Sequence, residues 1–360
     1  MNAQQENLDR QTARNLAVDA LRICAMIMVT ILHITGHGLE NAKIIPLSGT
    51  YWIVLIIRVF SSVAVNCFVL ITGYFLSMQN IKFRKLIMLW LQVWMYSAGI
   101  YLLLCMIPTT GVMFSTKELI RNGLPLLSNQ YWFFKYYFLL YLISPVLNTL
   151  IQAVDKIKYQ KILILLLIVF CVIPSVNIFG DSFGANEGYS LIWFAVLYLV
   201  AGYFRRYSIN LRVGPIWLYV ASCLTLCFIC LIGDIMGSLV RVMANLQRNY
   251  NSPLVFLASV SLVLLCTSSN WHFGKIANML VKTLSPLVFG VYLLHDHGVM
   301  AGLIWEKWAK LSGAAASPLG FAMRAAYVLF VLFICGITVE WLRSNLLKSI
   351  ANLMNRISAR

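Results

Sequence analysis

The chain has 360 residues, of which 61% are hydrophobic and only 11% are charged, a composition that excludes a water-soluble globular domain. Apolar runs of about twenty residues, the length that crosses a bilayer as a helix, recur from end to end. The net charge of +16 comes mostly from basic segments between these runs, so it does not indicate a nucleic acid partner.

Ten apolar segments predict the transmembrane helices of an all-α integral membrane protein, a single domain over residues 1–360 in the lipid bilayer. In chain order they are 15–37, 51–77, 86–107, 131–153, 161–178, 189–204, 214–233, 253–270, 281–303 and 320–342. The fifth and sixth are the least regular, because Pro174 interrupts one and a turn-rich loop separates the two. Short tails are expected at 1–14 and 343–360.

Basic residues alternate between the two sides of this predicted topology. The side with both tails holds Arg10, Arg14, Arg22, Lys82, Arg84, Lys85, Lys156, Lys158, Lys161, Arg205, Arg206, Arg212, Lys275, Lys282, Arg343, Lys348, Arg356 and Arg360. The other side holds Lys43, Lys117, Arg121, Arg241, Arg248, Lys307, Lys310 and Arg324. Eighteen basic residues thus lie on one side and eight on the other, and with Arg58 and Lys135 inside spans this accounts for all 28. The excess on the side with both tails places both termini in the cytoplasm.

The first apolar segment carries an acid, an arginine and two histidines on one helical face. Arg22 and His33 are three helical turns plus ~20° apart, and Asp19 and His37 fall within ~60° of Arg22. An arginine at the centre of a membrane helix costs ~2.5–3.5 kcal/mol, so this face is expected to line a polar cavity. A structural Asp19–Arg22 salt bridge with a hydrogen-bonded core histidine would also explain the pattern.

Polar and aromatic side chains in later segments are weaker candidates. Arg58 and Lys135 are intramembrane cations that either line a path for a substrate or form structural pairs. Trp132 begins the aromatic block YWFFKYYFLLY, which is typical of an interfacial belt and is also able to stack on sugars. His295 is expected at an outer depth similar to that of His33, either facing it or bonded at the interface. Glu340 would pair with a basic residue or lie at the cytoplasmic interface.

A metal site is the other interpretation of the histidines. His33 and His37 form an i, i+4 pair, and His295, Asp296 and His297 form a second group, as in some zinc sites. No cysteine or carboxylate stands beside the first pair in the sequence, and nothing in the sequence pairs the two helices. The prediction is therefore a site without a metal.

Several motifs resemble those of acyltransferase family 3, whose members are multi-pass membrane enzymes acting on extracytoplasmic glycans. The segment RICAMIMVTILH, preceded by VDALR, reproduces the family's arginine, ten residues, histidine motif. NCFVLITGYFLS is similar to the end of the family's second helix, with Cys67 and Thr72 at two departures from it. IKFRKL stands at the family's arginine-rich motif, with Lys82, Arg84 and Lys85.

Two further blocks extend the resemblance over most of the chain. YWFFKYYFLLYLISPVLN is similar to the family's aromatic fourth span. SPLVFGVYLLH is similar to its late S-x-x-x-F-G-x-Y-L-x-H pattern, here Ser285, Phe289, Gly290, Tyr292 and His295. The segments from the fifth to the eighth match only in hydropathy.

The resemblance implies a membrane O-acyltransferase, most simply an O-acetyltransferase, of the bacterial cytoplasmic membrane. Its expected donor is cytoplasmic acetyl-CoA, and its expected acceptor is a hydroxyl of a cell-surface polysaccharide, a glycolipid or a lipid-linked oligosaccharide. Polysaccharide-assembly proteins are further expected partners. The sequence does not distinguish acetyl from succinyl, nor does it name the glycan.

Residue roles follow from the resemblance together with the helical spacing. His33 lies ~16 Å deeper than Arg22, about one pantetheine arm, so Arg22 would hold a phosphate while the thioester reaches His33. Asp19 would orient Arg22, and His33 would act as general base or as nucleophile. Lys82, Arg84 and Lys85 would gather the nucleotide phosphates. His295, Tyr292, Trp132, Arg58 and Lys135 are the candidates on the acceptor side.

A transporter or exporter of a sugar or an anionic substrate is the main alternative, because many spans and a polar stripe serve transport equally well. No inverted repeat is visible between the two halves, which disfavours it. A scaffold of a polysaccharide-assembly complex would leave Arg22 and His33 without a reason.

Overall fold

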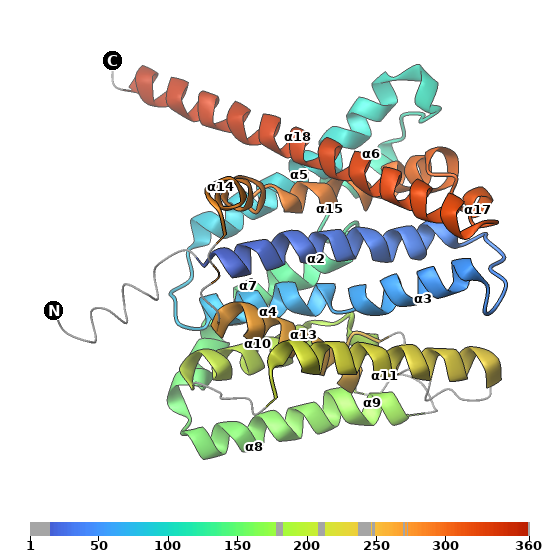
Figure 1. Ribbon diagram of the computed structural model, residues 1–360. Helices are drawn as coiled ribbons and strands as arrows, with labels where there is room; N and C mark the ends of the chain where they lie inside the picture. Colours follow the sequence, from blue (N-terminus) through green and yellow to red (C-terminus); the bar gives the residue numbers. More distant parts are fainter. Residues whose placement is uncertain are drawn as a thin grey trace.

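The computed structural model describes residues 15–177, 183–207, 213–236, 246, 249–268, 271 and 273–358, without the side chains of 351–358. Every regular element in these ranges is helical, which confirms the predicted all-α class (Figure 1). Six of the basic residues that support the predicted orientation lie outside the described residues: Arg10, Arg14, Arg212, Arg241, Arg248 and Arg360.

Among the described residues, twelve helices form the main part of the bundle. They are α2 (Leu16–Thr35), α3 (Gly49–Ser61), α4 (Ala64–Leu76), α5 (Phe83–Met106), α7 (Trp132–Ala153), α8 (Lys156–Leu167), α10 (Leu191–Arg206), α11 (Pro215–Met236), α13 (Pro253–Ser268), α14 (Lys275–Leu284), α15 (Val288–His295) and α18 (Pro318–Ser358). The shorter ones are η1 (His37–Leu39), η2 (Pro108–Thr110), α6 (Thr116–Gly123), η3 (Ile168–Val172), α9 (Ile173–Val176), η4 (Asn186–Gly188), α16 (Gly298–Gly302), η6 (Leu303–Trp308) and α17 (Leu311–Ala314).

By length and composition, the described residues contain fewer candidate spans than the predicted ten. Within the described residues, seven helical segments are long and apolar enough to cross a membrane, or eight if the bent pair α14 and α15 counts as one. The two remaining predicted spans form α10 and α13, which have 16 residues each. Each is ~24 Å long, short of the ~30 Å thickness of a hydrocarbon core.

Two predicted spans, the second and the ninth, are broken in the structure. The second span divides into α3 and α4 at Ser62, whose hydroxyl donates a hydrogen bond back to the Val59 carbonyl at 2.7 Å. The ninth bends by 46° between α14 and α15 at Pro286, which has no N–H to continue the helix. It ends again at Asp296, so the predicted single helix is replaced by three short ones.

Helix α2 runs through the middle of the bundle and packs against α3, α4, α13, α14, α15 and α18 (Figure 1). Two glycines of the motifs allow helices to approach closely. A Cβ on Gly73 would lie 2.8 Å from the Tyr198 Cα, and one on Gly290 would lie 2.5 Å from the Glu340 Cβ. The first contact brings α4 against α10, and the second brings α15 against α18.

The described N-terminal start of α2 and the C-terminal end of α18 lie at the same end of the bundle (Figure 1). From the charge bias we predict that this end is cytoplasmic. In a background with the exposed Cys24 and Cys335 changed to serine, a cysteine at Lys117 should react with a membrane-impermeant maleimide added outside. A cysteine at Lys158 should react only after permeabilisation, and the reverse labelling would refute the orientation.

Candidate active site

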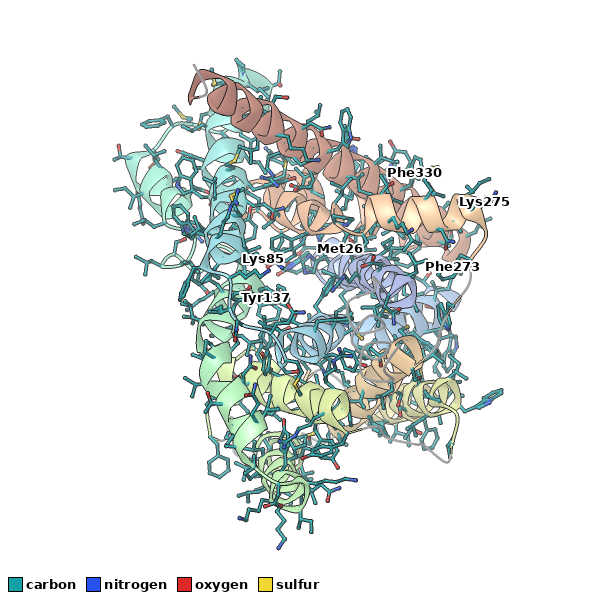
Figure 2. All side chains as sticks on the ribbon, turned by 90° about the vertical axis from the view of Figure 1, so that its left-hand side faces the viewer. Met26, Lys85, Tyr137, Phe273, Lys275 and Phe330 are labelled. Atoms are coloured by element: carbon teal, nitrogen blue, oxygen red, sulfur yellow. The ribbon has the colours of Figure 1, made fainter. Side chains whose placement is uncertain are left out.

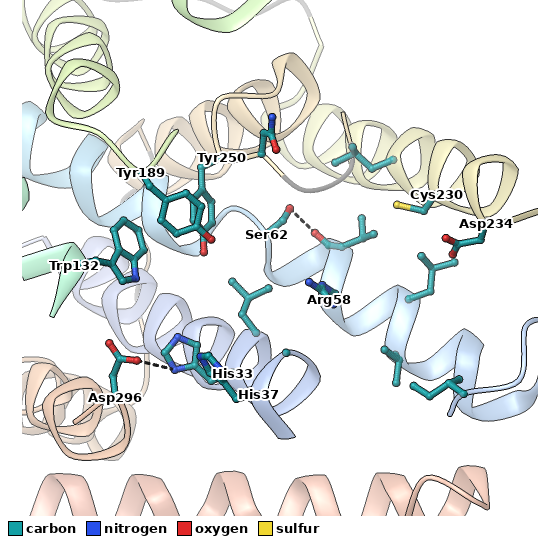
Figure 3. Close-up of a pocket in the computed structure, with 18 of the residues that line it drawn as sticks. His33, His37, Arg58, Ser62, Trp132, Tyr189, Cys230, Asp234, Tyr250 and Asp296 are labelled. Atoms are coloured by element: carbon teal, nitrogen blue, oxygen red, sulfur yellow. Dashed lines mark hydrogen bonds and ion pairs between the residues drawn. The ribbon is translucent and has the colours of Figure 1, made fainter. Parts of the chain in front are cut away.

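The bundle contains a large cavity near the end of α2 that bears His33. Its volume is about 690 Å³, within the ~300–1,000 Å³ range of small-molecule sites. The lining residues are Leu32, His33, Gly36, His37, Ile44, Tyr51, Val54, Leu55, Arg58, Val59, Ser62, Asn129, Gln130, Trp132, Tyr189, Leu226, Cys230, Asp234, Asn249, Tyr250 and Asp296 (Figure 3). Polar and aromatic groups therefore meet in a space that would hold a small ligand.

A basic pocket lies at the opposite end of α2. It consists of two adjoining hollows of about 310 and 480 Å³ that share Lys82, Lys85 and Leu89. Arg22 lines the first hollow, and Arg84 lines the second. Figure 2 looks onto this end of the bundle, with Lys85 and Tyr137 bordering the pocket.

A narrow apolar passage of about 40 Å³ lies along α2 between these two spaces and shares Leu32, His33, Trp132 and Tyr250 with the large cavity. Successive turns of three helices line first the basic pocket and then the passage. The pairs are Arg22 and Met26 on α2, Thr72 and Phe68 on α4, and Tyr137 and Phe133 on α7. The linings of the basic pocket and the passage thus follow one another along the same three helices, and the passage meets the large cavity at His33.

At the basic end, Arg22 is held by the residue that the sequence pairs with it. Its Nη1 lies 2.7 Å from Asp19 Oδ1, and the Ser285 hydroxyl donates to the same oxygen at 3.1 Å. Asp19 is 3% exposed, whereas the Arg22 side chain keeps 37% of its surface and lies 5.9 Å from the Phe75 ring centre. The arrangement fixes the guanidinium and leaves it accessible.

Arg343 is a further cation of the basic pocket, and it was not among the predicted site residues. It lines the hollow that contains Lys82, Arg84 and Lys85. Its Nε and Nη2 donate to the two carboxylate oxygens of the buried Glu340 at 2.9 and 2.6 Å. Glu340 thus has a basic partner at this end, and the guanidinium of that partner lines the hollow beside three other basic side chains.

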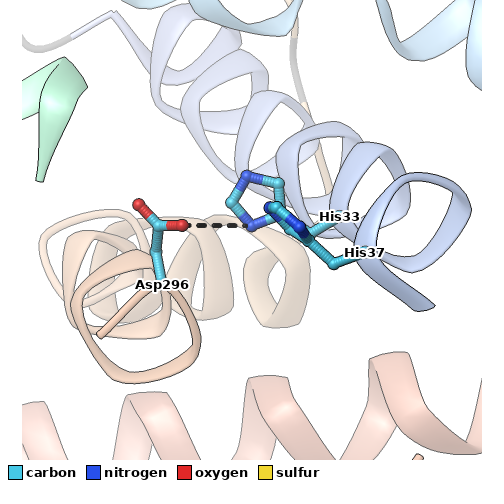
Figure 4. A group of neighbouring side chains, drawn as sticks. All are labelled: His33, His37 and Asp296. Atoms are coloured by element: carbon cyan, nitrogen blue, oxygen red, sulfur yellow. Dashed lines mark ion pairs between the residues drawn. The ribbon is translucent and has the colours of Figure 1, made fainter. Parts of the chain in front are cut away.

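His33 lies in a cluster of imidazole and indole rings where the passage meets the large cavity. Its ring centre is 5.3 Å from that of His37, 4.9 Å from that of His295 and 6.5 Å from that of Trp305. Its Nδ1 lies 3.8 Å from Asp296 Oδ1 (Figure 4). The cluster therefore joins helix α2 to the residue that directly follows α15.

The two ring nitrogens of His33 have different surroundings. Nδ1 is buried without a hydrogen bond and lies 3.8 Å from Asp296 Oδ1. We therefore take Nε2 as the nitrogen that a substrate can reach. The neighbouring His295 is fully buried, and its Nδ1 lies 2.5 Å from the Val291 carbonyl, which requires a proton on that nitrogen. The two rings belong to one cluster but differ at Nδ1, which is hydrogen-bonded to the backbone in His295 and has no hydrogen bond in His33.

Tyr292 lies one helical turn before Asp296 and lines the apolar passage. Its hydroxyl is buried close to the Asp296 carboxylate and makes no hydrogen bond of standard geometry to the described residues. An unpaired buried donor costs free energy, so this hydroxyl is available to a ligand oxygen that enters the passage.

An aromatic cluster forms one wall of the large cavity (Figure 3). The ring centre of Trp132 is 4.4 Å from that of Tyr189 and 6.0 Å from that of Tyr250, and the last two are 4.9 Å apart. Arg58 also lines the cavity, but Lys135, expected on the same path, does not. Lys135 is ~200° around α7 from Phe133 and lies 5.5 Å from the Tyr136 ring centre.

The fold removes one sequence argument against a metal site. The sequence places no carboxylate beside His33 and His37, but the fold brings Asp296 to them, with one ligand atom from each residue within 4.8 Å of the others (Figure 4). Two imidazoles and a carboxylate are able to hold zinc with an open position. The same three groups also fit a base with an orienting carboxylate, so geometry permits both uses.

Arg343, Tyr189, Tyr250 and Asp234 are the site residues that sequence reasoning missed, and Asp296 was named only in the metal interpretation, as a neighbour of His295 and His297. A signal existed for Asp296, because it directly follows His295 in a motif with two histidines. Sequence reasoning used Arg343 only to assign the membrane topology. The two tyrosines lie in connections between helices, where helical periodicity gives no information.

A family model described as an acyltransferase domain matches residues 15–340, nearly the whole chain. Neither the curated proteins nor the solved structures contain a significant match.

Proposed function

The chain belongs to acyltransferase family 3 and is a multi-pass membrane acyltransferase, and from this premise we propose that it moves an acetyl group from cytoplasmic acetyl-CoA to a hydroxyl of a cell-surface polysaccharide or glycolipid. One observation above all supports transfer from the cytoplasmic donor to an acceptor at the other end of the bundle. A basic pocket and a polar, aromatic cavity lie at opposite ends of one helical face, and His33 lies where the apolar passage opens into the cavity.

The basic pocket suits the nucleotide end of acyl-CoA. Arg22, which Asp19 orients, would bind a phosphate through its planar fork, and the cluster of Lys82, Arg84, Lys85 and Arg343 would attract the remaining phosphates. The pantetheine arm would then follow α2 for ~16 Å to His33. The passage of about 40 Å³ is narrower than such an arm, so its lining side chains must move when the donor binds.

At His33 we propose general base catalysis. Nε2 takes the proton of the acceptor hydroxyl while the hydroxyl oxygen attacks the thioester carbonyl carbon. The C–S bond then breaks, and the imidazolium returns the proton to the departing thiolate. Asp296 would stabilise the imidazolium from the Nδ1 side, and the Tyr292 hydroxyl would donate to the carbonyl oxygen as it gains negative charge.

The large cavity supports direct transfer, because donor and acceptor can both reach His33 without a covalent relay. A nucleophilic His33 would instead leave an acyl-imidazole when the donor is supplied alone. Mass spectrometry of the intact protein after incubation with acetyl-CoA distinguishes the two mechanisms: an unmodified protein agrees with the base, and a stable acetyl adduct on His33 agrees with the nucleophile.

The experiment that tests the function uses the purified protein in vesicles, with labelled acetyl-CoA on one side and glycan on the other. Labelled glycan and free CoA are the expected products. A transporter would move its substrate without cleaving the thioester, so glycan or CoA flux without transfer would refute the proposal. Mass spectrometry of the surface glycan with and without the gene would identify the acceptor.

Arg22→Ala is expected to weaken acetyl-CoA binding about 10- to 100-fold, because a charge-assisted hydrogen bond contributes about 1.5–3 kcal/mol. Arg22→Lys should recover only part of the affinity, since lysine offers a point charge without the planar fork. Calorimetric titration of acetyl-CoA into the purified variants measures both. Lys161→Ala, a change outside the pocket lining, serves as the charge control, and unchanged affinity in Arg22→Ala would remove Arg22 from the donor site.

A further inference from the structure

Arg58 is the only arginine or lysine among the described residues that line the large cavity. It belongs to α3, nine residues after Gly49, which places it ~14 Å along an apolar segment that is long enough to span the membrane. Its side chain is exposed to the cavity, and Figure 3 shows it between the aromatic cluster and Asp234. A cation is thus placed deep in the span and directed at open space.

No described residue forms an ion pair with Arg58. Two carboxylates share the cavity, but each has another neighbour. Asp296 lies 3.8 Å from His33 Nδ1, and Asp234 accepts a hydrogen bond from the Tyr51 hydroxyl at 2.8 Å. An arginine inside a membrane segment is costly and normally has a partner or a function. The missing partner of Arg58 is therefore expected to arrive with a ligand.

We infer that Arg58 binds a carboxylate or phosphate of the acceptor, so that the acceptor is an anionic glycan. This inference rests on the proposed function and adds the chemical class of its acceptor. The guanidinium matches the planar oxygen pairs of both anions, and it lies in the same cavity as Trp132, Tyr189 and Tyr250, on whose rings a sugar can stack.

A second source of negative charge is the acyl group itself, if the donor is succinyl-CoA. We assign the anion to the acceptor, because the donor path reaches the cavity at His33, whereas Arg58 does not line that path and shares the cavity with the aromatic wall that suits a sugar. Binding in the absence of any acyl donor separates the two sources.

The test measures binding of three probes to the purified full-length protein: methyl glucoside, methyl glucuronide and methyl glucoside 6-phosphate. Wild type is expected to bind at least one anionic probe about 10- to 100-fold more tightly than the neutral one. Arg58→Gln should lose this preference, and Arg58→Lys should keep part of it. Arg121→Gln, which removes an exposed arginine paired with Glu118 on α6, is the matched control and should behave as wild type.

Equal affinity of wild type for the three probes, or an anionic preference that survives in Arg58→Gln, would overturn the inference. It would also be overturned if Arg58→Gln changed only the ratio of succinyl to acetyl transfer, since the anion would then belong to the donor. Retained acetyl-CoA binding shows that the variants are folded. Because the binding measurements with the three probes need no acyl transfer, they are independent of whether the proposed reaction occurs.

Discussion

His33→Ala is expected to lower acyl transfer about 10²- to 10⁴-fold, the usual contribution of a general base, with acetyl-CoA binding largely retained. The reason is the position of the ring. His33 lines both the apolar passage and the large cavity, so its accessible nitrogen lies where a donor from one space meets an acceptor from the other. His33→Gln should lose as much activity, because an amide cannot accept a proton at neutral pH. The measurement is initial-rate transfer of labelled acetyl, together with donor titration.

His37→Gln is the matched comparison, because His37 lines the same cavity one helical turn farther along. It is exposed, does not line the passage, and its ring centre lies 5.3 Å from that of His33. We expect this variant to keep most of its activity. Loss in His37→Gln with survival in His33→Ala would move the catalytic assignment by one turn.

The same pair of variants separates the base from a metal centre. If His33, His37 and Asp296 held a zinc ion, both histidine changes would abolish transfer, a chelator would inhibit the wild type, and added zinc would restore it. If His33 acts as a base, a chelator should leave the rate unchanged and only the His33 variants should fail. Metal analysis of the purified protein provides a readout that does not depend on activity.

Much of the fold follows from hydrophobic patterning, because each predicted apolar segment contains helix in the structure. The difference between the predicted ten spans and the candidates among the described residues arises at α10 and α13. In α10 ten of the 16 residues are buried by neighbouring helices, so most of its apolar surface faces protein. Hydropathy measures the absence of polar groups and does not distinguish a helix surrounded by protein from one surrounded by lipid.

Some site residues could likewise be predicted from the sequence, and others could not. The face with Arg22 and His33 was predictable, because a single helix fixes the angle between them. Asp296 was not, because its approach to His33 depends on where α15 ends and on how α15 packs against α2. Tyr250 likewise reaches Trp132 through a connection before α13. Helical periodicity describes one element at a time, whereas these contacts join segments more than one hundred residues apart.

Asp296→Asn is expected to lower the maximal rate about 10²- to 10⁴-fold, by analogy with the effect of neutralising the carboxylate beside a catalytic histidine. Asparagine has nearly the same shape, so packing after α15 should persist. It has no charge to stabilise the imidazolium, and its amide can donate to Nδ1, which would place the His33 proton on Nε2, the nitrogen that must accept one. The expected signature is therefore a loss of kcat with acetyl-CoA affinity unchanged.

The present distance of 3.8 Å between Asp296 Oδ1 and His33 Nδ1 is longer than a hydrogen bond, as is common before substrates bind. We expect it to shorten when Nε2 takes the acceptor proton, because the ring then carries a full positive charge. Asp296→Glu should restore part of the rate, whereas Glu118→Gln, a change of the same charge on α6, should have no effect. A wild-type kcat in Asp296→Asn would show that His33 works without this carboxylate, and a loss of acetyl-CoA binding would show that Asp296 supports the structure of the passage instead of the chemistry.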